Sequence, residues 1–446
     1  MYNDLRTAVR DGFGRVRAEL EELVRIPSVS APGFDPQQVR RSAERIGELL
    51  TASGFDGVRL LEIEGAHPAV YGEIPAPDGA PTVLLYAHHD VQPPGPEDEW
   101  ETTPFDPIER NGRLLGRGTA DDKCGVVVHL AAIRAFGGDV PVGVKVFMEG
   151  EEEIGSANLG AFLDKHRELL SADVIVIGDA GNWAVGAPAL TTSLRGLVDC
   201  IVEVRTLENA VHSGMFGGPV PDAITVLARI VASLHDERGN VAVPDLLHAP
   251  AGDVDLTEAE VRSQAGAVEG LELVGDGSLT ARLWYQPAIS VLAIDAPPIS
   301  EAINQLVPVA RAKVSLRIAP GQDPQRALRA LVAHLEANAP WGADVTISPG
   351  ALGDACRLDA TNDASVIFKQ AFGIAYGTET VEMGVGGSIP FVAAFEEAYP
   401  HASILLTGVM DPTSQIHAPN ESLSLIDLER GILGEAIALR MLAESA

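Results

Sequence analysis

Apolar residues recur every three or four positions among charged ones over the first 24 residues, which is typical of an amphipathic helix with one buried face. Pro27 ends this helix, because the residue before a proline is disfavoured in the helical region. The same period predicts further helices over residues 37–52, 126–136 and 364–376 and at the C-terminal end. Short apolar runs between them predict buried strands over Thr82–His88 and residues 142–147, 173–177 and 403–408.

The pattern changes in the middle of the chain. Strand, helix, strand, helix and strand are predicted there in turn, over residues 197–205, 221–235, 309–318, 325–337 and 344–347. The second of these strands alternates cleanly, with a polar face made of Arg311, Lys313, Ser315 and Arg317. We expect an α/β fold with a smaller α+β domain inserted, in which helices cover one face of an antiparallel sheet. The expected boundaries are 1–190 and 351–446 for the larger domain and 191–350 for the inserted one, while residues 237–300 are rich in loops.

Composition narrows the classes of partner. The 446 residues carry a formal charge of −31, which would repel a phosphate backbone or an anionic membrane. The chain has no stretch of about 18 or more apolar residues, and its N-terminal helix lacks the apolar core of a signal peptide. Three widely spaced cysteines form no disulfide framework. We therefore expect a cytoplasmic protein with neither nucleic acid nor membrane as its partner.

Imidazole and carboxylate groups follow the ends of three predicted strands. His88 and Asp90 follow the first, Glu152 and Glu153 the second, and Asp179 the third. Each group alone could be a polar strand end or the solvated first turn of a helix. In open α/β sheets, however, such strand ends meet where ligands bind. Burying so many carboxylates together would be too costly unless cations neutralised them, so the pattern indicates a metal site.

A glycine-rich loop over residues 116–125 adds a further carboxylate. The loop opens the predicted helix 126–136 and places Asp121 or Asp122 at its N-terminus. Aspartate is a favoured N-cap residue, so capping alone could explain this position.

The motifs taken together resemble those of the M20 metallopeptidase family, and within it the dipeptidases related to carnosinase. They occur in family order and span most of the chain. The matching motifs are H-x-D at 88–90, G-R-G-x-x-D-x-K at 116–123, E-G-x-E-E-x-G-S at 149–156, Asp179, H-S-G at 212–214, S-L-R at 315–317, G-G-S-I-P at 386–390 and H-x-x-N-E at 417–421.

The resemblance implies a zinc-exopeptidase-like catalytic domain with a mixed central sheet and an inserted ferredoxin-like lid and dimerisation domain. It also implies two divalent metal ions bridged by Asp121, with His88 and Asp179 completing one site and Glu153 and His417 the other. These ligand types favour zinc, and manganese also fits them. A cis peptide bond is expected after the bridging aspartate.

The same resemblance assigns roles to residues around the metals. Glu152 would be the general base that takes a proton from a metal-bridging water, and Asp90 would hold His88 in position. His212 would stabilise the oxyanion from the partner subunit of a homodimer formed through the inserted domain. Arg317 would bind the free C-terminal carboxylate of the substrate. Further positions that match substrate-holding residues are Asn304, Gly387 and Ser388.

Two features depart from the family pattern. Cys124 stands where relatives usually have a small residue, so its thiol could pack in the core or lie near the metals. Gly384-Val385 replaces an Arg-Glu pair of the carnosinase-like members, which leaves the side-chain preference for the substrate open. The remaining helix and strand histidines are expected to be ordinary surface or helix residues, namely His89, His129, His166, His235 and His334.

The leading functional hypothesis is a metallopeptidase that cleaves dipeptides or short peptides with a free C-terminal carboxylate. Asp179 favours this hypothesis, because the deacylase and carboxypeptidase branches tend to carry glutamate there. The alternative is an amidohydrolase that removes the acyl group of N-acyl amino acids with the same centre. A binding protein that has lost its chemistry is disfavoured, because Glu152 and all five expected metal ligands are present.

Overall fold

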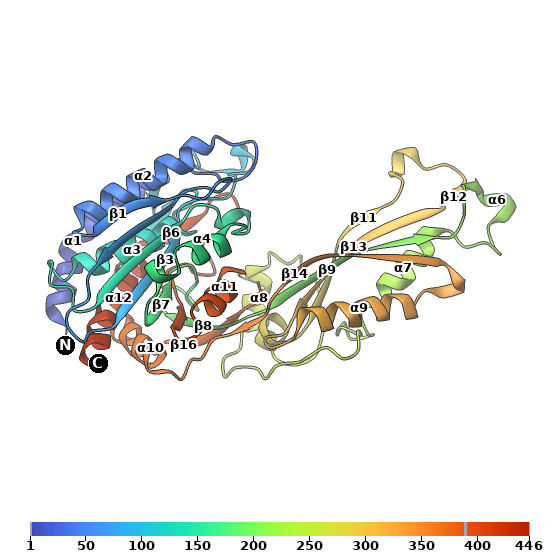
Figure 1. Cartoon of the computed structure of the whole chain (residues 1–446). Coiled ribbons are helices and arrows are strands. Elements are labelled where there is room, and N and C mark those ends of the chain that lie inside the picture. The colour runs from blue at the N-terminus through green and yellow to red at the C-terminus, as the bar shows by residue number, and fades with distance from the viewer. Residues whose placement is uncertain (1, 388–389, 446) are drawn as a thin grey trace. The chain divides into compact units, whose positions relative to one another are not determined.

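The computed structural model describes residues 2–387 and 390–445, and these divide into two compact units (Figure 1). Unit 1 comprises Met1–Thr192, Leu358–Met383 and Pro390–Ala446, and unit 2 comprises Ser193–Arg357 with Gly384–Ile389. The chain therefore leaves unit 1 after its first 192 residues, builds unit 2, and returns.

Unit 1 is built on a mixed sheet. Seven of its strands, in spatial order, are β1 (Asp56–Leu61), β2 (Ala69–Ile74), β6 (Gly143–Glu149), β3 (Thr82–His88), β7 (Val174–Ile177), β17 (Ser403–Leu406) and β8 (Ala189–Leu194). The central strands β6, β3, β7 and β17 are parallel, whereas β1, β2 and β8 pair in the antiparallel sense. The expected mixed central sheet is confirmed.

Helices cover both faces of this sheet. On one face Leu85 and its neighbours join a large apolar core with α1 (Asn3–Val24), α3 (Lys123–Arg134), α10 (Asp363–Tyr376) and α12 (Leu425–Ser445). Successive strand residues point to opposite faces, so the ring of Tyr86 lies on the other side. There it stacks on Phe391 of α11 (Pro390–Ala398) with ring centroids 4.7 Å apart. The remaining helices of unit 1 are α2 (Pro36–Ala52), α4 (Leu159–Lys165) and α5 (Arg167–Leu170).

A small sheet of three short strands joins distant parts of unit 1. Strand β5 (Arg113–Leu115) pairs with β4 (Ile108–Arg110) on one side and with β18 (Ser422–Ser424) on the other. This pairing brings the loop at 116–125 next to the segment that follows His417.

Unit 2 contains the antiparallel sheet that the sequence predicts. Its strand order is β11 (Ala288–Asp295), β13 (Val309–Ile318), β9 (Gly196–Arg205) and β14 (Asp344–Gly353). One face is buried beneath α7 (Ala223–Ala232) and α9 (Pro324–Ala337), and Cys200 belongs to this core as expected. Strand β11 lies in the segment that the sequence pattern left as loops. The shorter elements of unit 2 are β10 (Val211–His212), α6 (Ser213–Phe216), α8 (Glu258–Gln264) and β12 (Gln305–Leu306).

Within the part of the chain that the structure describes, no helix combines the length and the apolar character that crossing a bilayer requires.

Candidate metal centre

Three parallel strands of unit 1 end at the same edge of the sheet. His88 at the end of β3 pairs with Glu149 at the end of β6, and Tyr86 pairs with Ile177 at the end of β7. The residues that follow these strands therefore emerge side by side. This register brings the Glu152 and Glu153 turn and Asp179 to the position of His88, as the sequence pattern predicts.

Asp121 lies between two imidazole rings. Its Oδ1 atom is 3.0 Å from Nε2 of His88, and its Oδ2 atom is 2.9 Å from Nε2 of His417. Nε2 of His417 is also 3.2 Å from a carboxylate oxygen of Glu153. One carboxylate thus presents a separate oxygen to each side of the centre, which is the arrangement that a carboxylate shared by two cations requires.

The surrounding carboxylates complete two overlapping groups that could hold metal ions. In the first, ligand atoms of His88, Glu152 and Asp179 lie within 4.8 Å of one another, and in the second the same holds for His88, Asp121 and Glu153. Nε2 of His88 is 3.9 Å from a carboxylate oxygen of Asp179 and equally far from one of Glu152. Glu152 therefore lies close enough to be a ligand by distance alone.

The electrostatics of this cluster fit bound cations. Burial, together with the nearby Glu153 and Asp121 carboxylates, raises the pKa of Glu152 to about 7 against the opposing effect of His88. Burial also raises the pKa of Asp179 well above its usual value. Hydrogen bonds with Asp121 and Glu153 raise the pKa of His417 to about 10. So many carboxylates compete for protons that divalent cations, held by these oxygen and imidazole donors, would stabilise the charged forms.

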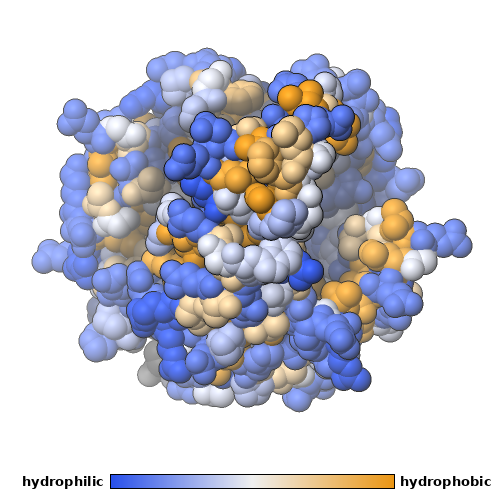
Figure 2. All heavy atoms as spheres, turned by 90° about the vertical axis from the view of Figure 1, so that its right-hand side faces the viewer, coloured by the Kyte–Doolittle hydropathy of each residue, from blue (hydrophilic) through white to orange (hydrophobic). Residues whose placement is uncertain are grey.

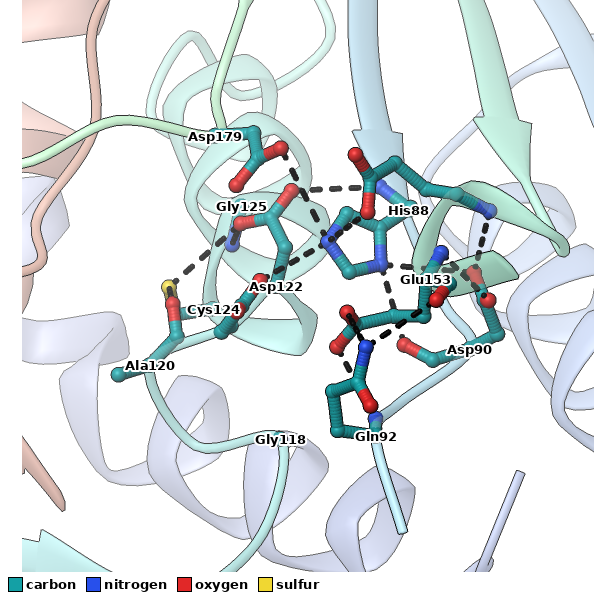
Figure 3. A network of polar contacts seen from close by, with 12 residues as sticks. His88, Asp90, Gln92, Gly118, Ala120, Asp122, Cys124, Gly125, Glu153 and Asp179 are labelled. Carbon is teal, nitrogen blue, oxygen red and sulfur yellow. Dashed lines mark hydrogen bonds and ion pairs between the residues drawn. The ribbon is translucent and has the colours of Figure 1, made fainter. Parts of the chain in front are cut away.

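Asp90 lies beside His88 and Glu153, as the close view in Figure 3 shows. Its buried carboxylate accepts hydrogen bonds from the backbone N–H groups of Glu152 and Glu153, each at 3.1 Å, and from the hydroxyl of Ser30 at 2.6 Å. Nδ1 of His88 lies 3.0 Å from the backbone carbonyl oxygen of Asp90 and 3.5 Å from its carboxylate. Asp90 therefore contacts both His88 and the turn that carries Glu152, the predicted general base.

Two further residues hold the centre and were not singled out from the sequence. The side-chain amide of Gln92 donates to Glu153 at 2.8 Å, and its backbone N–H donates to the same carboxylate at 3.0 Å. Because Gln92 follows His88 and Asp90 at intervals of two, the alternation of an extended segment could have revealed it. Glu421 accepts backbone N–H groups at Ala120 and Asp121 and pairs with Arg117. It is the last residue of the H-x-x-N-E motif.

The loop at 116–125 divides its two adjacent aspartates between different tasks. Asp121 faces the imidazoles, whereas Asp122 caps α3 by accepting the N–H of Gly125 at 3.2 Å and also accepts the N–H of His88. The bond between the two aspartates is cis, as the family resemblance implies. The thiol of Cys124 donates to the backbone carbonyl of Ala120 at 3.0 Å, which favours the packing interpretation.

The residues with expected substrate contacts belong to unit 2. His212 is exposed, and its Nδ1 atom accepts the N–H of Gly214. The backbone carbonyl of Asn304 accepts the N–H of Ser213, which follows His212. Arg317 is half-buried on β13. Gly387 also lies in unit 2, whereas Ser388 lies outside the described residues.

The position of Gly384 leaves no room for the arginine of carnosinase-like members. A Cβ atom there would lie 2.7 Å from Cβ of Trp284 and 2.8 Å from Oγ of Ser193. In this chain a tryptophan therefore occupies the space next to that backbone position.

The expectation for His89 was wrong, because this residue follows strand β3 and is fully buried rather than a surface or helix residue. His129 is a helix residue on α3, as expected, and it is also buried. His89 contacts the backbone carbonyl of Pro68, and His129 contacts Glu435 and the backbone of Tyr86. A histidine inside an apolar run is compatible with either burial or exposure, so the sequence could not distinguish the two.

Comparison with known proteins agrees with the motifs and the fold. The model of the peptidase family M20/M25/M40 matches residues 84–438, which is most of the chain. The chain belongs to the M20 peptidase family. This M20 peptidase is 36% identical over 432 residues to the cysteinylglycine-S-conjugate dipeptidase of Corynebacterium striatum, covering 95% of this chain and 94% of that protein.

Solved structures of dipeptidases share the fold of this M20 peptidase. The dipeptidase Dug1p of Saccharomyces cerevisiae matches with a TM-score of 0.81 and 23% identity, over 99% of this chain and 98% of that one. Human carnosine dipeptidase 1 matches with a TM-score of 0.80 and 24% identity, over the same shares of the two chains. The expected fold class is confirmed, and the chain is a peptidase enzyme.

The buried carboxyl group of Glu149 should make the stability of the metal-free M20 peptidase depend on pH. Burial raises the pKa of Glu149 from 4.5 to about 8, although the hydroxyl of Tyr86 donates to it at 2.7 Å. The folded state therefore holds a proton that the unfolded state releases. This contribution to stability is complete below about pH 4.5 and is lost as the pH rises towards about 8.

We expect Glu149→Gln to become more stable relative to the unsubstituted protein as the pH rises from 5 to 8, by about 1.4 kcal/mol per pH unit at most. Glutamine keeps an acceptor for Tyr86 and cannot ionise. Urea unfolding of chelator-treated protein at several pH values would measure the difference. Parallel stability curves for the two proteins would contradict the assignment.

Proposed function

We propose that this M20 peptidase is a two-metal dipeptidase that cleaves short peptides with a free C-terminal carboxylate, and cysteinylglycine or its S-conjugates in particular. The observation that carries the two-metal centre is Asp121, which turns one oxygen to His88 and the other to His417. The substrate class is supported by the relative at 36% identity, which is named as a cysteinylglycine-S-conjugate dipeptidase. A cytoplasmic location stays a prediction.

The cations would be held by His88 and Asp179 on one side and by Glu153 and His417 on the other, with Asp121 shared. These donors favour zinc and are compatible with manganese. When bound, such a pair of cations would acidify a bridging water and polarise the carbonyl of the scissile bond.

Glu152 would act as the general base. It would accept a proton from the attacking water and later donate it to the leaving amine. The exposures of neighbouring acids support this division of roles. The side chain of Glu152 is 20% exposed, so it can reach a substrate, whereas that of Glu153 is 3% exposed and hydrogen-bonded by Gln92.

Unit 2 would supply the contacts to the substrate. Arg317 would bind the terminal carboxylate, for which a planar guanidinium is suited, and Asn304, Gly387 and Ser388 would hold the rest. The alternative amidohydrolase would use the same centre on N-acyl amino acids.

A panel of substrates tests the proposed activity. We expect the protein loaded with zinc or manganese to hydrolyse Cys-Gly and S-alkyl Cys-Gly with a much higher kcat/KM than the matching N-acetyl amino acids. Amidating the C-terminal carboxylate of the same dipeptides should remove most of the activity. Preference for N-acetyl amino acids would support the alternative activity and overturn the proposed one.

We also propose that the protein is a homodimer formed through unit 2, with His212 acting in the site of the partner subunit. Unit 2 exposes apolar side chains that a partner could cover, and Figure 2 shows hydrophobic patches among polar ones on the face that carries α6. The exposed apolar residues of unit 2 include Met215, Leu292, Ile294, Ile299 and Ile303.

Mixing two inactive variants tests this arrangement. His212→Ala and Glu152→Gln should each be inactive alone, whereas unfolding and refolding them together should restore roughly a quarter of the wild-type activity. Half of the dimers would then be mixed, and each mixed dimer would contain one intact site. Sedimentation of the same samples would measure the dimer. A dimer without recovered activity would place His212 in its own subunit's site or outside catalysis.

A further inference from the structure

A buried polar pair lies in the core of unit 1, outside all the family motifs. His129 on α3 and Glu435 on α12 are each 1% exposed. Nδ1 of His129 lies 3.0 and 2.8 Å from the two carboxylate oxygens of Glu435. Its other nitrogen, Nε2, lies 3.0 Å from the backbone carbonyl oxygen of Tyr86 on β3. The pair therefore connects two helices with the strand that carries His88.

Both nitrogens of this ring face hydrogen-bond acceptors. A neutral imidazole has only one N–H, so donating to a carboxylate and a carbonyl together requires the protonated form. Burial opposes the charged form, but the Glu435 carboxylate outweighs it and raises the pKa of His129. A buried ion pair of this kind often stabilises a fold no better than apolar side chains of similar volume. Its distinct contribution is two hydrogen bonds of fixed direction.

The carbonyl of Tyr86 joins the ends of two strands. Besides His129 it accepts the backbone N–H of Gly178 at 2.8 Å. Tyr86 is two residues before His88, and Gly178 immediately precedes Asp179. The carbonyl oxygen of Tyr86 therefore links the segment that carries His88 to the segment that carries Asp179. His129, on α3, contacts the same oxygen.

Gly178 shows how closely the imidazole approaches the second segment. A Cβ atom on Gly178 would lie 2.8 Å from Nε2 of His129, which is too short for a non-bonded contact. The ring therefore occupies the space that a side chain would fill, directly beside the residue that precedes Asp179.

We propose that His129 and Glu435 are positioning residues that fix the spacing of His88 and Asp179, and so set the affinity for the cation that these two would hold. The pair touches neither the cation nor the substrate. The inference rests on the proposed two-metal centre. The other side of that centre has separate supports, because Gln92 holds Glu153 and Glu421 holds the loop of Asp121. Replacing the pair should therefore weaken the binding of one of the two cations and leave the binding of the other unchanged.

The test measures cation binding directly, by titrating Co²⁺ into chelator-treated full-length protein and following heat and visible absorbance. His129→Leu alone would leave Glu435 buried without its partner and could fail to fold. The double variant His129→Leu/Glu435→Met removes both partners, so its metal-free unfolding midpoint should stay close to the wild type. We expect it to bind one Co²⁺ as the wild type does and the other about 10–100-fold more weakly.

Two further variants sharpen the result. Gly178→Ala should push His129 away from the strand ends and weaken the same Co²⁺, with the same change in its absorbance. The matched control is Glu19→Met/Arg134→Met, which removes another ion pair on α3, one that links this helix to α1. The control should bind both Co²⁺ ions with unchanged affinity.

Wild-type affinity for both Co²⁺ ions in the double variant would overturn the inference, and so would an equal weakening of both. An equal effect in the α1 control would also overturn it, because the pair would then act only through general stability. Failure of the proposed function is distinguishable, since in that case the wild type itself would bind no pair of cations or hydrolyse no dipeptide.

Discussion

Replacing Glu152 with glutamine is expected to lower kcat for dipeptide hydrolysis by about 10²–10⁴-fold while two cations remain bound. Glutamine keeps the size and the hydrogen-bonding capacity of the side chain but cannot take a proton from water. The effect should appear in kcat rather than in KM, because the lost interaction belongs to the reaction step. Steady-state kinetics together with the metal content of the same sample would measure both quantities.

The neighbouring acid provides a matched control. Glu151 is buried and accepts the backbone N–H groups of His67 and Asn158, so it holds the turn rather than the substrate. Glu151→Gln should retain most of the kcat. An unchanged kcat in Glu152→Gln would show that Glu152 is not the general base. Loss of a cation from that variant would instead make Glu152 a ligand, which its distance of 3.9 Å from Nε2 of His88 also allows.

The sequence predicted the elements whose hydrophobic period is strong. Strand β3 occupies Thr82–His88 as expected, and the alternation over Val309–Ile318 matches the burial of β13 except at Ser315, which is buried. Strand β1 was not predicted, because this edge strand is largely exposed and offers no apolar run. Strand β11 was missed although its sequence is largely apolar, and most of its residues beyond Ile289 are exposed. Pairing with a neighbouring strand, rather than burial of its side chains, defines each of these two elements.

The sequence also predicted which residues gather at the centre, because their positions after parallel strands imply a common edge. It could not predict how they are supported. Glu421 binds the backbone of Asp121 across 300 positions, and His129 meets Glu435 across 306. Neither local spacing nor periodicity records such a contact. The direction of a buried polar side chain is fixed only when the complete fold places an acceptor in front of it.

The largest effect is expected for Asp121→Asn. An amide bears no negative charge, and its nitrogen cannot accept, so the variant could face His88 or His417 with an oxygen but not both. We expect it to hold at most one cation even in excess metal. Its kcat should fall by about 10³-fold or more, because cation stabilisation of the transition state contributes several kcal/mol. The metal content and the kinetics would be measured at increasing zinc or manganese concentration.

Comparing Asp90→Asn with Asp121→Asn distinguishes the loss of a supporting group from the loss of a shared metal ligand. Asp90 contacts His88 and the Glu152 turn from behind, so its replacement should weaken binding about 10–100-fold yet leave two sites that fill at high metal concentration. Asp121→Asn should not recover under the same conditions, since the missing charge belongs to the centre itself. In Asp121→Asn, added metal should also raise the unfolding temperature less than it does in the wild type. Stabilisation by a ligand depends on the affinity of that ligand for the folded state. If Asp121→Asn filled both sites and regained its rate in excess metal, one carboxylate would not be shared, and each cation would need its own separate set of ligands.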